Sequence, residues 1–228
     1  MTATRQQKTT VTPGAPPFDG LSRFVQAGAW AAVASGVALA ASLLLDWLGV
    51  PHERLGSEAF LKGSYLASSG LRLLSVALLP WALVGIYGRQ SVVAGTFGLW
   101  AFAIVFLGAT LTVGSAWAEV FVWPTLAQAA PGMMSGSATD MSMYLVAGLN
   151  VSFPLFGLGL ILFGVATLRA GVYPRWAAVL LVVSIPVTMF LDPTPGTFQE
   201  SIGQILLGTS VAVLGLYAMS IASSDNRS

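Results

Sequence analysis

Six apolar runs, each long enough to cross a lipid bilayer, dominate this chain. A membrane helix needs about 20 apolar residues, because roughly 30 Å of hydrocarbon is crossed at 1.5 Å per residue. Only 8% of the 228 residues are charged, whereas a soluble domain carries about 25%. We therefore predict an all-α, polytopic membrane protein, a bundle of six transmembrane helices. The predicted spans are 24–49, 60–87, 92–123, 141–169, 173–191 and 199–222.

The segments outside the runs are short and polar. Residues 1–22 are rich in Thr, Pro and Gly and lack periodicity, which predicts a disordered tail. Residues 224–228 form a second tail, so 23–223 is the membrane domain. The first run is too long for the core of a signal peptide, and further runs follow it, so it is interpreted as a membrane helix. The third run exceeds what a bilayer requires and should tilt or project.

The positive charges are distributed unequally between the two sides of the predicted bundle. Loops on the cytoplasmic side of a membrane protein carry the excess of Lys and Arg. Only Arg54 and Lys62 fall on one side, so both termini, which lie on the other, are predicted to be cytoplasmic. The residues on that more positive side are Arg5, Lys8, Arg23, Arg89, Arg169, Arg175 and Arg227.

The composition excludes several classes of function. The chain has no cysteine, which rules out disulfides, thiolate catalysis and iron–sulfur ligation. The single histidine, His52, rules out a histidine-rich metal site or a bis-histidine haem. The net charge of +1 offers no basic field for nucleic acid, and no phosphate-binding or dinucleotide motif occurs. We therefore expect no metal, no cofactor and no nucleic-acid partner.

Polar residues inside the runs share one face of each helix, mostly in the non-cytoplasmic half. Their spacings of three, four and seven residues place each set on a single side of its helix. Polar faces are costly against lipid, so these faces should line a pocket open to the outside. The members are Ser35, Ser42 and Asp46; Tyr65, Ser68, Arg72 and Ser75; Thr112, Ser115, Glu119 and Trp123; Tyr144 and Asn150; Ser184, Thr188 and Asp192; and Glu200 and Gln204.

Arg72 is the most deeply placed charge by sequence, about 18 Å below the start of its predicted helix. A charge near the bilayer centre costs about 2.5–3.5 kcal/mol on insertion scales, so it needs a partner. Glu119 and Asp46 are the candidates, because both lie on neighbouring helices toward the same leaflet. The pair is either structural, fixing the register of the helices, or a site where Arg72 holds the anionic or polar end of a ligand.

The two acids and three nearby tryptophans permit a second interpretation. Asp46 adjoins Trp47, and Glu119 lies between Trp117 and Trp123. A carboxyl group in such surroundings can have a raised pKa and act as a catalytic acid, while the rings stabilise positive charge. Alternatively, Glu119 is an ordinary interfacial carboxylate and the tryptophans form an outer aromatic belt.

Two segments resemble a known type of protein. LFGVATLRAGVYPRWAAVLLVVSIPV (162–187) and EVFVWPTLAQAAPG (119–132) are similar to segments of uncharacterised six-helix bacterial membrane proteins, in which a helix ends in Leu-Arg-x-Gly and the chain turns through Pro-Arg-Trp. The resemblance implies a bundle in the bacterial inner membrane. It carries no established activity and no functional residue.

Three functions remain open from the sequence. The first is a pocket that binds a small amphipathic or lipidic ligand, with membrane lipid as a partner. The second is a membrane-embedded enzyme, such as a cyclase or isomerase, in which Glu119 or Asp46 supplies the acid. The third is a small transporter, which the apolar cytoplasmic half weakens. The candidate ligand-binding residues are Arg72, Tyr65, Trp47, Ser115, Trp117, Trp123, Tyr144, Asn150 and Gln204.

Overall fold

The computed structural model describes residues 19–49, 57–134, 143–190 and 198–225, and within these ranges it contains helices and no strand. The all-helical class predicted from the sequence is thereby confirmed. α1 begins at Asp19 and α6 ends at Asp225, so each helix extends into a segment that the sequence assigned to a tail. The elements are α1 (Asp19–Gly49), η1 (Ser57–Leu61), α2 (Gly63–Ala129), α3 (Pro131–Met134), α4 (Met143–Ala170), α5 (Arg175–Phe190) and α6 (Phe198–Asp225).

α2 is a hairpin of two helical arms, 63–94 and 96–129. A straight helix of 67 residues would be about 100 Å long. Instead the hydroxyl of Tyr65 donates a hydrogen bond of 3.3 Å to the carbonyl oxygen of Glu119, near the far end of the element. The chain reverses at Gly95, whose φ of 59° and ψ of −162° interrupt the helix. Only glycine adopts this backbone conformation readily.

Four helices in the described part of the chain are long and apolar enough to cross a membrane. They are Arg23–Leu48, Gly63–Ala129, Val151–Ala170 and Ile202–Ile221. The sequence predicted six separate spans. The second and third of these fall together in α2, and the fifth forms α5, whose 16 residues reach about 24 Å.

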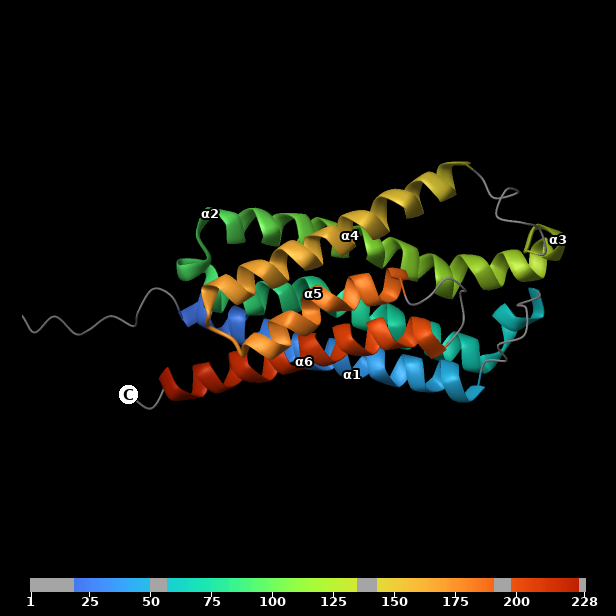
Figure 1. The fold of residues 1–228 in the computed structure, drawn as a ribbon. Helices are drawn as coiled ribbons and strands as arrows, with labels where there is room; N and C mark the ends of the chain where they lie inside the picture. Colours follow the sequence, from blue (N-terminus) through green and yellow to red (C-terminus); the bar gives the residue numbers. More distant parts are fainter. Residues whose placement is uncertain (1–18, 50–56, 135–142, 191–197, 226–228) are drawn as a thin grey trace, which may run out of the picture.

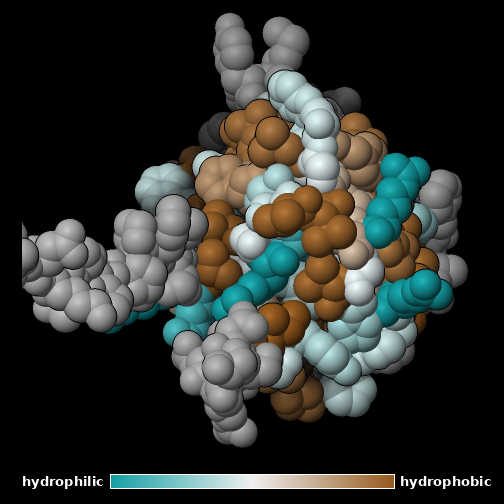
Figure 2. Space-filling model, turned by 90° about the vertical axis from the view of Figure 1, so that its left-hand side faces the viewer, coloured by the Kyte–Doolittle hydropathy of each residue, from teal (hydrophilic) through white to brown (hydrophobic). Residues whose placement is uncertain are grey.

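The long helices form a closed ring. α1 packs against α2 and α6, α4 packs against α2 and α5, and α5 packs against α6. Figure 1 shows these helices running lengthwise through one bundle, with the first helical turns of α1 and the last turns of α6 at the end where α2 reverses. We call this end the Gly95 end. Figure 2, which looks onto it, shows hydrophilic residues scattered between hydrophobic ones.

Close packing fills the bundle toward the Gly95 end. A Cβ added to Gly28 of α1 would lie 2.5 Å from the carbonyl oxygen of Trp81, so the helices approach backbone to backbone there. Such contacts are typical of small residues in membrane helices. Buried side chains occupy the remaining space, and the largest are Leu83, Ile86, Leu160, Phe163, Leu181 and Leu214.

Side-chain contacts tie the reversal of α2 to α4 and to the turn between α4 and α5. The amide of Gln90 donates a hydrogen bond of 3.0 Å to the hydroxyl of Thr167. The hydroxyl of Tyr173, in the turn itself, donates one of 2.9 Å to the carbonyl oxygen of Ile86. The guanidinium of Arg169 lies 4.7 Å from the centre of the Phe97 ring, a cation–π contact. The hydrophobic core and these bonds hold the Gly95 end shut.

Candidate functional site

Arg72 bridges two carboxylates that come from different helical segments. Its Nη1 lies 3.3 Å from Oε2 of Glu119, on the second arm of α2. Its Nη2 pairs with Oδ2 of Asp46, on α1. The sequence proposed these acids as the candidate partners, and the structure confirms the pairing with both together. We call Asp46, Arg72 and Glu119 the triad.

The triad carries a formal charge of −1, because two carboxylates meet one guanidinium. Its three side chains remain 26–30% exposed, so they are neither in a dry core nor fully in solvent. Such partial exposure lowers the desolvation cost that makes fully buried ion pairs expensive. Beside the triad, the Tyr65 hydroxyl donates its hydrogen bond to the backbone of Glu119. The Phe60 ring packs edge-on against the Tyr65 ring, with 5.1 Å between the ring centres.

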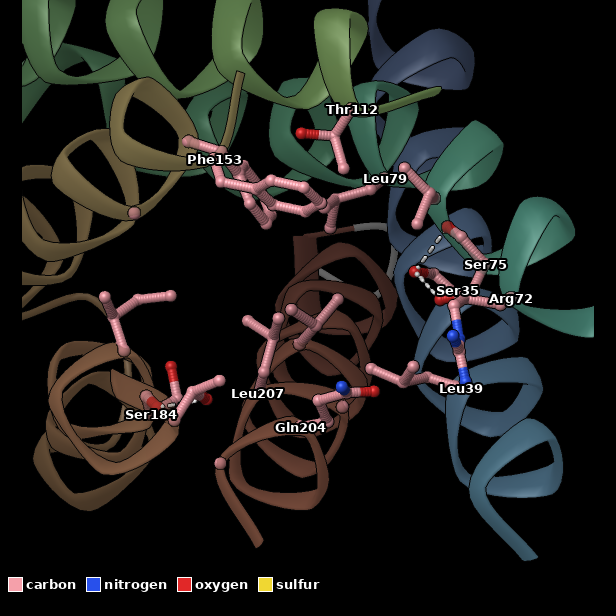
Figure 3. Close-up of a pocket in the computed structure, with 18 of the residues that line it drawn as sticks. Ser35, Leu39, Arg72, Ser75, Leu79, Thr112, Phe153, Ser184, Gln204 and Leu207 are labelled. Atoms are coloured by element: carbon pink, nitrogen blue, oxygen red, sulfur yellow. Dashed lines mark hydrogen bonds between the residues drawn. The ribbon is translucent and has the colours of Figure 1, made fainter. Parts of the chain in front are cut away.

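A cavity of about 500 Å³ lies inside the ring of helices, and Arg72 forms part of its wall. Figure 3 shows the side chains that converge on it from the surrounding helices, with the Phe153 ring reaching over it from α4. Most of the lining is aliphatic or aromatic. The lining residues are Ser35, Leu39, Arg72, Ser75, Val76, Leu79, Thr112, Phe153, Pro154, Phe156, Gly157, Leu158, Ile161, Ser184, Ile185, Thr188, Gly203, Gln204, Leu207, Gly208 and Val211.

The hydroxyl groups of the cavity wall are already hydrogen-bonded within the protein. Ser184 donates to the carbonyl oxygen of Leu181 at 2.8 Å, and Thr188 donates to that of Ser184 at 2.8 Å. Hydroxyls bonded to their own helix in this way present little polarity to a ligand. Thr112 does the same within α2, and Ser35 bonds to the backbone of Ser75.

Two further polar side chains belong to the described part of the wall. One is Arg72, the central member of the triad, whose guanidinium pairs with Asp46 and Glu119, and the other is Gln204, whose amide points toward the cavity in Figure 3. Both were candidate ligand-binding residues from the sequence. Apart from these two groups, the described wall offers a ligand mainly apolar contacts.

The other sequence candidates whose side chains the structure describes do not line the cavity. Asp46 and Glu119 lie in the triad, and Tyr65 contacts the backbone beside it. Ser115 is half-buried elsewhere on the second arm. For Tyr144, Asn150 and Glu200 the structure describes the helix but not the side chain, and Asp192 lies outside the described residues.

The three candidate tryptophans lie away from the cavity. Trp47 and Trp117 are exposed on the outside of the bundle, and Trp123 is half-buried and stacks on Phe60 with ring centres 6.5 Å apart. None of them supplies an aromatic face to the cavity wall. Sequence reasoning missed the apolar wall, of which Leu39, Leu79 and Leu207 are members, because it searched for polar residues.

Exposed tryptophans recur at equal spacing on two segments. Trp30 and Trp47 on α1 are seventeen residues apart, as are Trp100 and Trp117 on the second arm of α2, and all four are exposed. At 1.5 Å per residue each pair spans about 26 Å. Asp46 adjoins Trp47 and Glu119 follows Trp117 by two residues, so the triad lies level with one set of tryptophans.

No family model, curated protein or solved structure matches this chain. The site joins an apolar cavity to a charged triad.

Proposed function

We propose that this chain is a membrane protein that crosses the bilayer six times and binds a small amphipathic, lipid-like molecule in its cavity. The six crossings would be α1, the two arms of α2, α4, α5 and α6. Each arm of α2 exceeds 30 residues and so surpasses the roughly 20 that a crossing needs. The resemblance of 119–132 and 162–187 to bacterial membrane proteins favours the inner membrane of a bacterium.

The tryptophans and arginines support one placement in the membrane. Tryptophan concentrates at the two interfaces of a bilayer, and the spacing of about 26 Å on α1 and α2 is close to the thickness of its hydrocarbon. Arg23, Arg89, Arg169 and Arg175 lie near the Gly95 end. By the positive-inside rule this end faces the cytoplasm. The triad then lies at the outer interface.

The observation that carries this proposal is the junction between the apolar cavity and the triad. A hydrocarbon tail fits a wall of aliphatic and aromatic side chains, while a head group needs polar partners at one edge. Arg72 lies at that edge and reaches Asp46 and Glu119 behind it. Because the triad carries a formal charge of −1, it favours a cationic, zwitterionic or hydrogen-bonding head over a simple anion.

The two other functions have less support. An acid catalyst must reach its substrate, but neither Asp46 nor Glu119 lines the cavity, and both are paired with Arg72. A transporter needs a second route of release, but packed side chains such as Leu83, Phe163 and Leu214 fill the Gly95 end. We rank the membrane enzyme second and the transporter third.

A pair of variants on α6 tests the proposal. Leu207 lines the cavity, whereas Ile205, two residues earlier, is exposed outside it. The wild-type protein, purified with its own lipids, should retain an amphiphile in native mass spectrometry. Leu207→Trp should lose it by filling the cavity, and Ile205→Trp should keep it. Equal retention by Leu207→Trp and wild type, with the fold intact by circular dichroism, would refute cavity binding.

A further inference from the structure

The wall of the cavity reaches the surface of the bundle along α4. Among the lining residues that the structure describes, three are exposed to the surroundings: Phe153 at 51%, Leu158 at 53%, and Pro154. All three lie on α4, and the lining residues of the other helices are buried or half-buried. The cavity therefore opens sideways, beside the middle of α4.

The opening lies at a depth set by the contact of α4 with α2. A Cβ added to Gly108 would lie 2.6 Å from the Cα of Phe156, so these residues are level with one another. Trp117 is nine residues further along the same arm, about 14 Å away at 1.5 Å per residue. The exposed side chains of Leu107 and Leu111 near this level are also apolar. In the proposed placement, the opening faces hydrocarbon and not water.

α4 has a built-in weak point beside the opening. Pro154 lacks a backbone N–H, so the hydrogen bond to the carbonyl of the residue four positions earlier cannot form. A proline inside a helix permits bending at that place. Figure 1 shows the beginning of α4 diverging from α5 toward the end of the bundle opposite the Gly95 end. Movement of this segment would widen the opening without disturbing the packed Gly95 end.

The size of the cavity limits what can occupy it. A methylene group takes up about the volume of a water molecule in the liquid, roughly 30 Å³. A cavity of about 500 Å³ therefore holds one chain of about sixteen carbons. By the same measure, both chains of a phospholipid of that length would need about twice this volume.

We infer that the occupant is a single-chain amphiphile that enters sideways from the outer leaflet, past α4, with its head group at the triad. This inference rests on the proposed function and adds the class of ligand and its route. The opening lies at the depth of the hydrocarbon chains in the proposed placement. An amphiphile already in the outer leaflet would therefore have its own chain level with the opening. Its head would lie at the level of Trp47, where the triad is found.

Two matched variants on α4 test the route. Leu158 lies on the cavity wall at the opening, whereas Val151 is exposed on the same helix and is not part of the wall. The probe is lysophosphatidylcholine with a photoreactive sixteen-carbon chain, carried in phosphatidylcholine vesicles with the reconstituted full-length protein. The measurement is the rate at which cavity-lining residues of α6 become labelled, mapped by mass spectrometry of peptides.

The expected result is a tenfold or greater slowing in Leu158→Trp and an unchanged rate in Val151→Trp. Leu158→Ala should load faster than wild type, which keeps the test decisive if the tryptophan variant fails to fold. Equal rates in all three variants and wild type would overturn the sideways route. If Leu207→Trp also labels like wild type, the cavity is not the binding site and the proposed function fails as well.

Discussion

Arg72 and Glu119, 47 residues apart in the chain, form an ion pair across the two arms of the α2 hairpin, with 3.3 Å between Nη1 and Oε2. The same guanidinium pairs with Asp46 on α1. One cation thus holds three helical segments at the end of the bundle where the cavity lies. It also separates two carboxylates that would otherwise repel each other.

The first prediction concerns the pairing of one cation, Arg72, with two carboxylates. Arg72→Gln should destabilise the fold by about 1–3 kcal/mol, because it leaves two neighbouring carboxylates without their shared cation. Asp46→Asn should cost less, since Arg72 keeps one charged partner. Thermal unfolding in detergent measures both, and the triple variant with Glu119→Gln should recover part of the loss. An Arg72→Gln protein as stable as wild type would show that the triad does not stabilise the bundle.

The second prediction concerns the reversal of α2. Gly95 combines a φ of 59° with a ψ of −162°, a region that other residues enter at a cost of about 1–3 kcal/mol. Gly95→Ala should therefore lower the unfolding temperature. Gly114→Ala is the matched control, because it lies in the second arm with open space around it. That substitution should be neutral or stabilise by up to about 1 kcal/mol. Equal behaviour of the two variants would contradict the positive-φ turn.

The third prediction concerns alkaline pH. Burial raises the pKa of the Tyr173 phenol above its ordinary value of 10.0, and the nearby Arg89 opposes this only in part. Above pH 10 the unfolded phenol loses its proton while the folded one keeps it. The folded state then binds more protons, and stability falls by up to about 1.4 kcal/mol per pH unit as pH rises. Below pH 10 this contribution is constant.

Unfolding curves between pH 8 and pH 11 measure this slope. Tyr173→Phe should remove its share of the slope and cost about 1 kcal/mol at neutral pH, because the bond to the Ile86 carbonyl is lost. Tyr217→Phe, which removes an exposed tyrosine on α6, is the matched control for the loss of a phenol. A wild-type slope retained in Tyr173→Phe would contradict the assignment.

The sequence predicted the helices and the partners of Arg72 because both follow from simple constraints. Apolar length sets the helices, and a deeply placed cation requires carboxylates within reach. Asp46 and Glu119 were the acids on neighbouring spans, so the pairing could be anticipated. The helical face of Gln204 also followed from its spacing.

The depth of Arg72 in a membrane depends on where the spans are taken to begin. Counting from the start of a predicted span puts Arg72 near mid-membrane. In the structure α2 begins at Gly63, nine residues before Arg72, and its second arm continues ten residues past Glu119. In the proposed placement both arms project beyond the outer interface. The sequence also did not reveal the apolar cavity wall. Leu207 lines the cavity and Ile205 faces outward, but both are aliphatic residues of the same apolar run, so the sequence alone does not distinguish them.

The fourth prediction concerns the head group. Probes with the same sixteen-carbon chain should bind about tenfold more tightly with a quaternary ammonium or phosphocholine head than with a carboxylate, because the triad carries a formal charge of −1. Asp46→Asn brings that charge to zero and should reduce the preference severalfold. Glu58→Gln removes an exposed acid outside the triad and should leave it unchanged. Competition against the photoreactive probe in phosphatidylcholine vesicles gives the relative affinities. Tighter binding of the carboxylate probe by wild type would show instead that Arg72 meets the ligand as an isolated cation, with its two carboxylates drawn away from it.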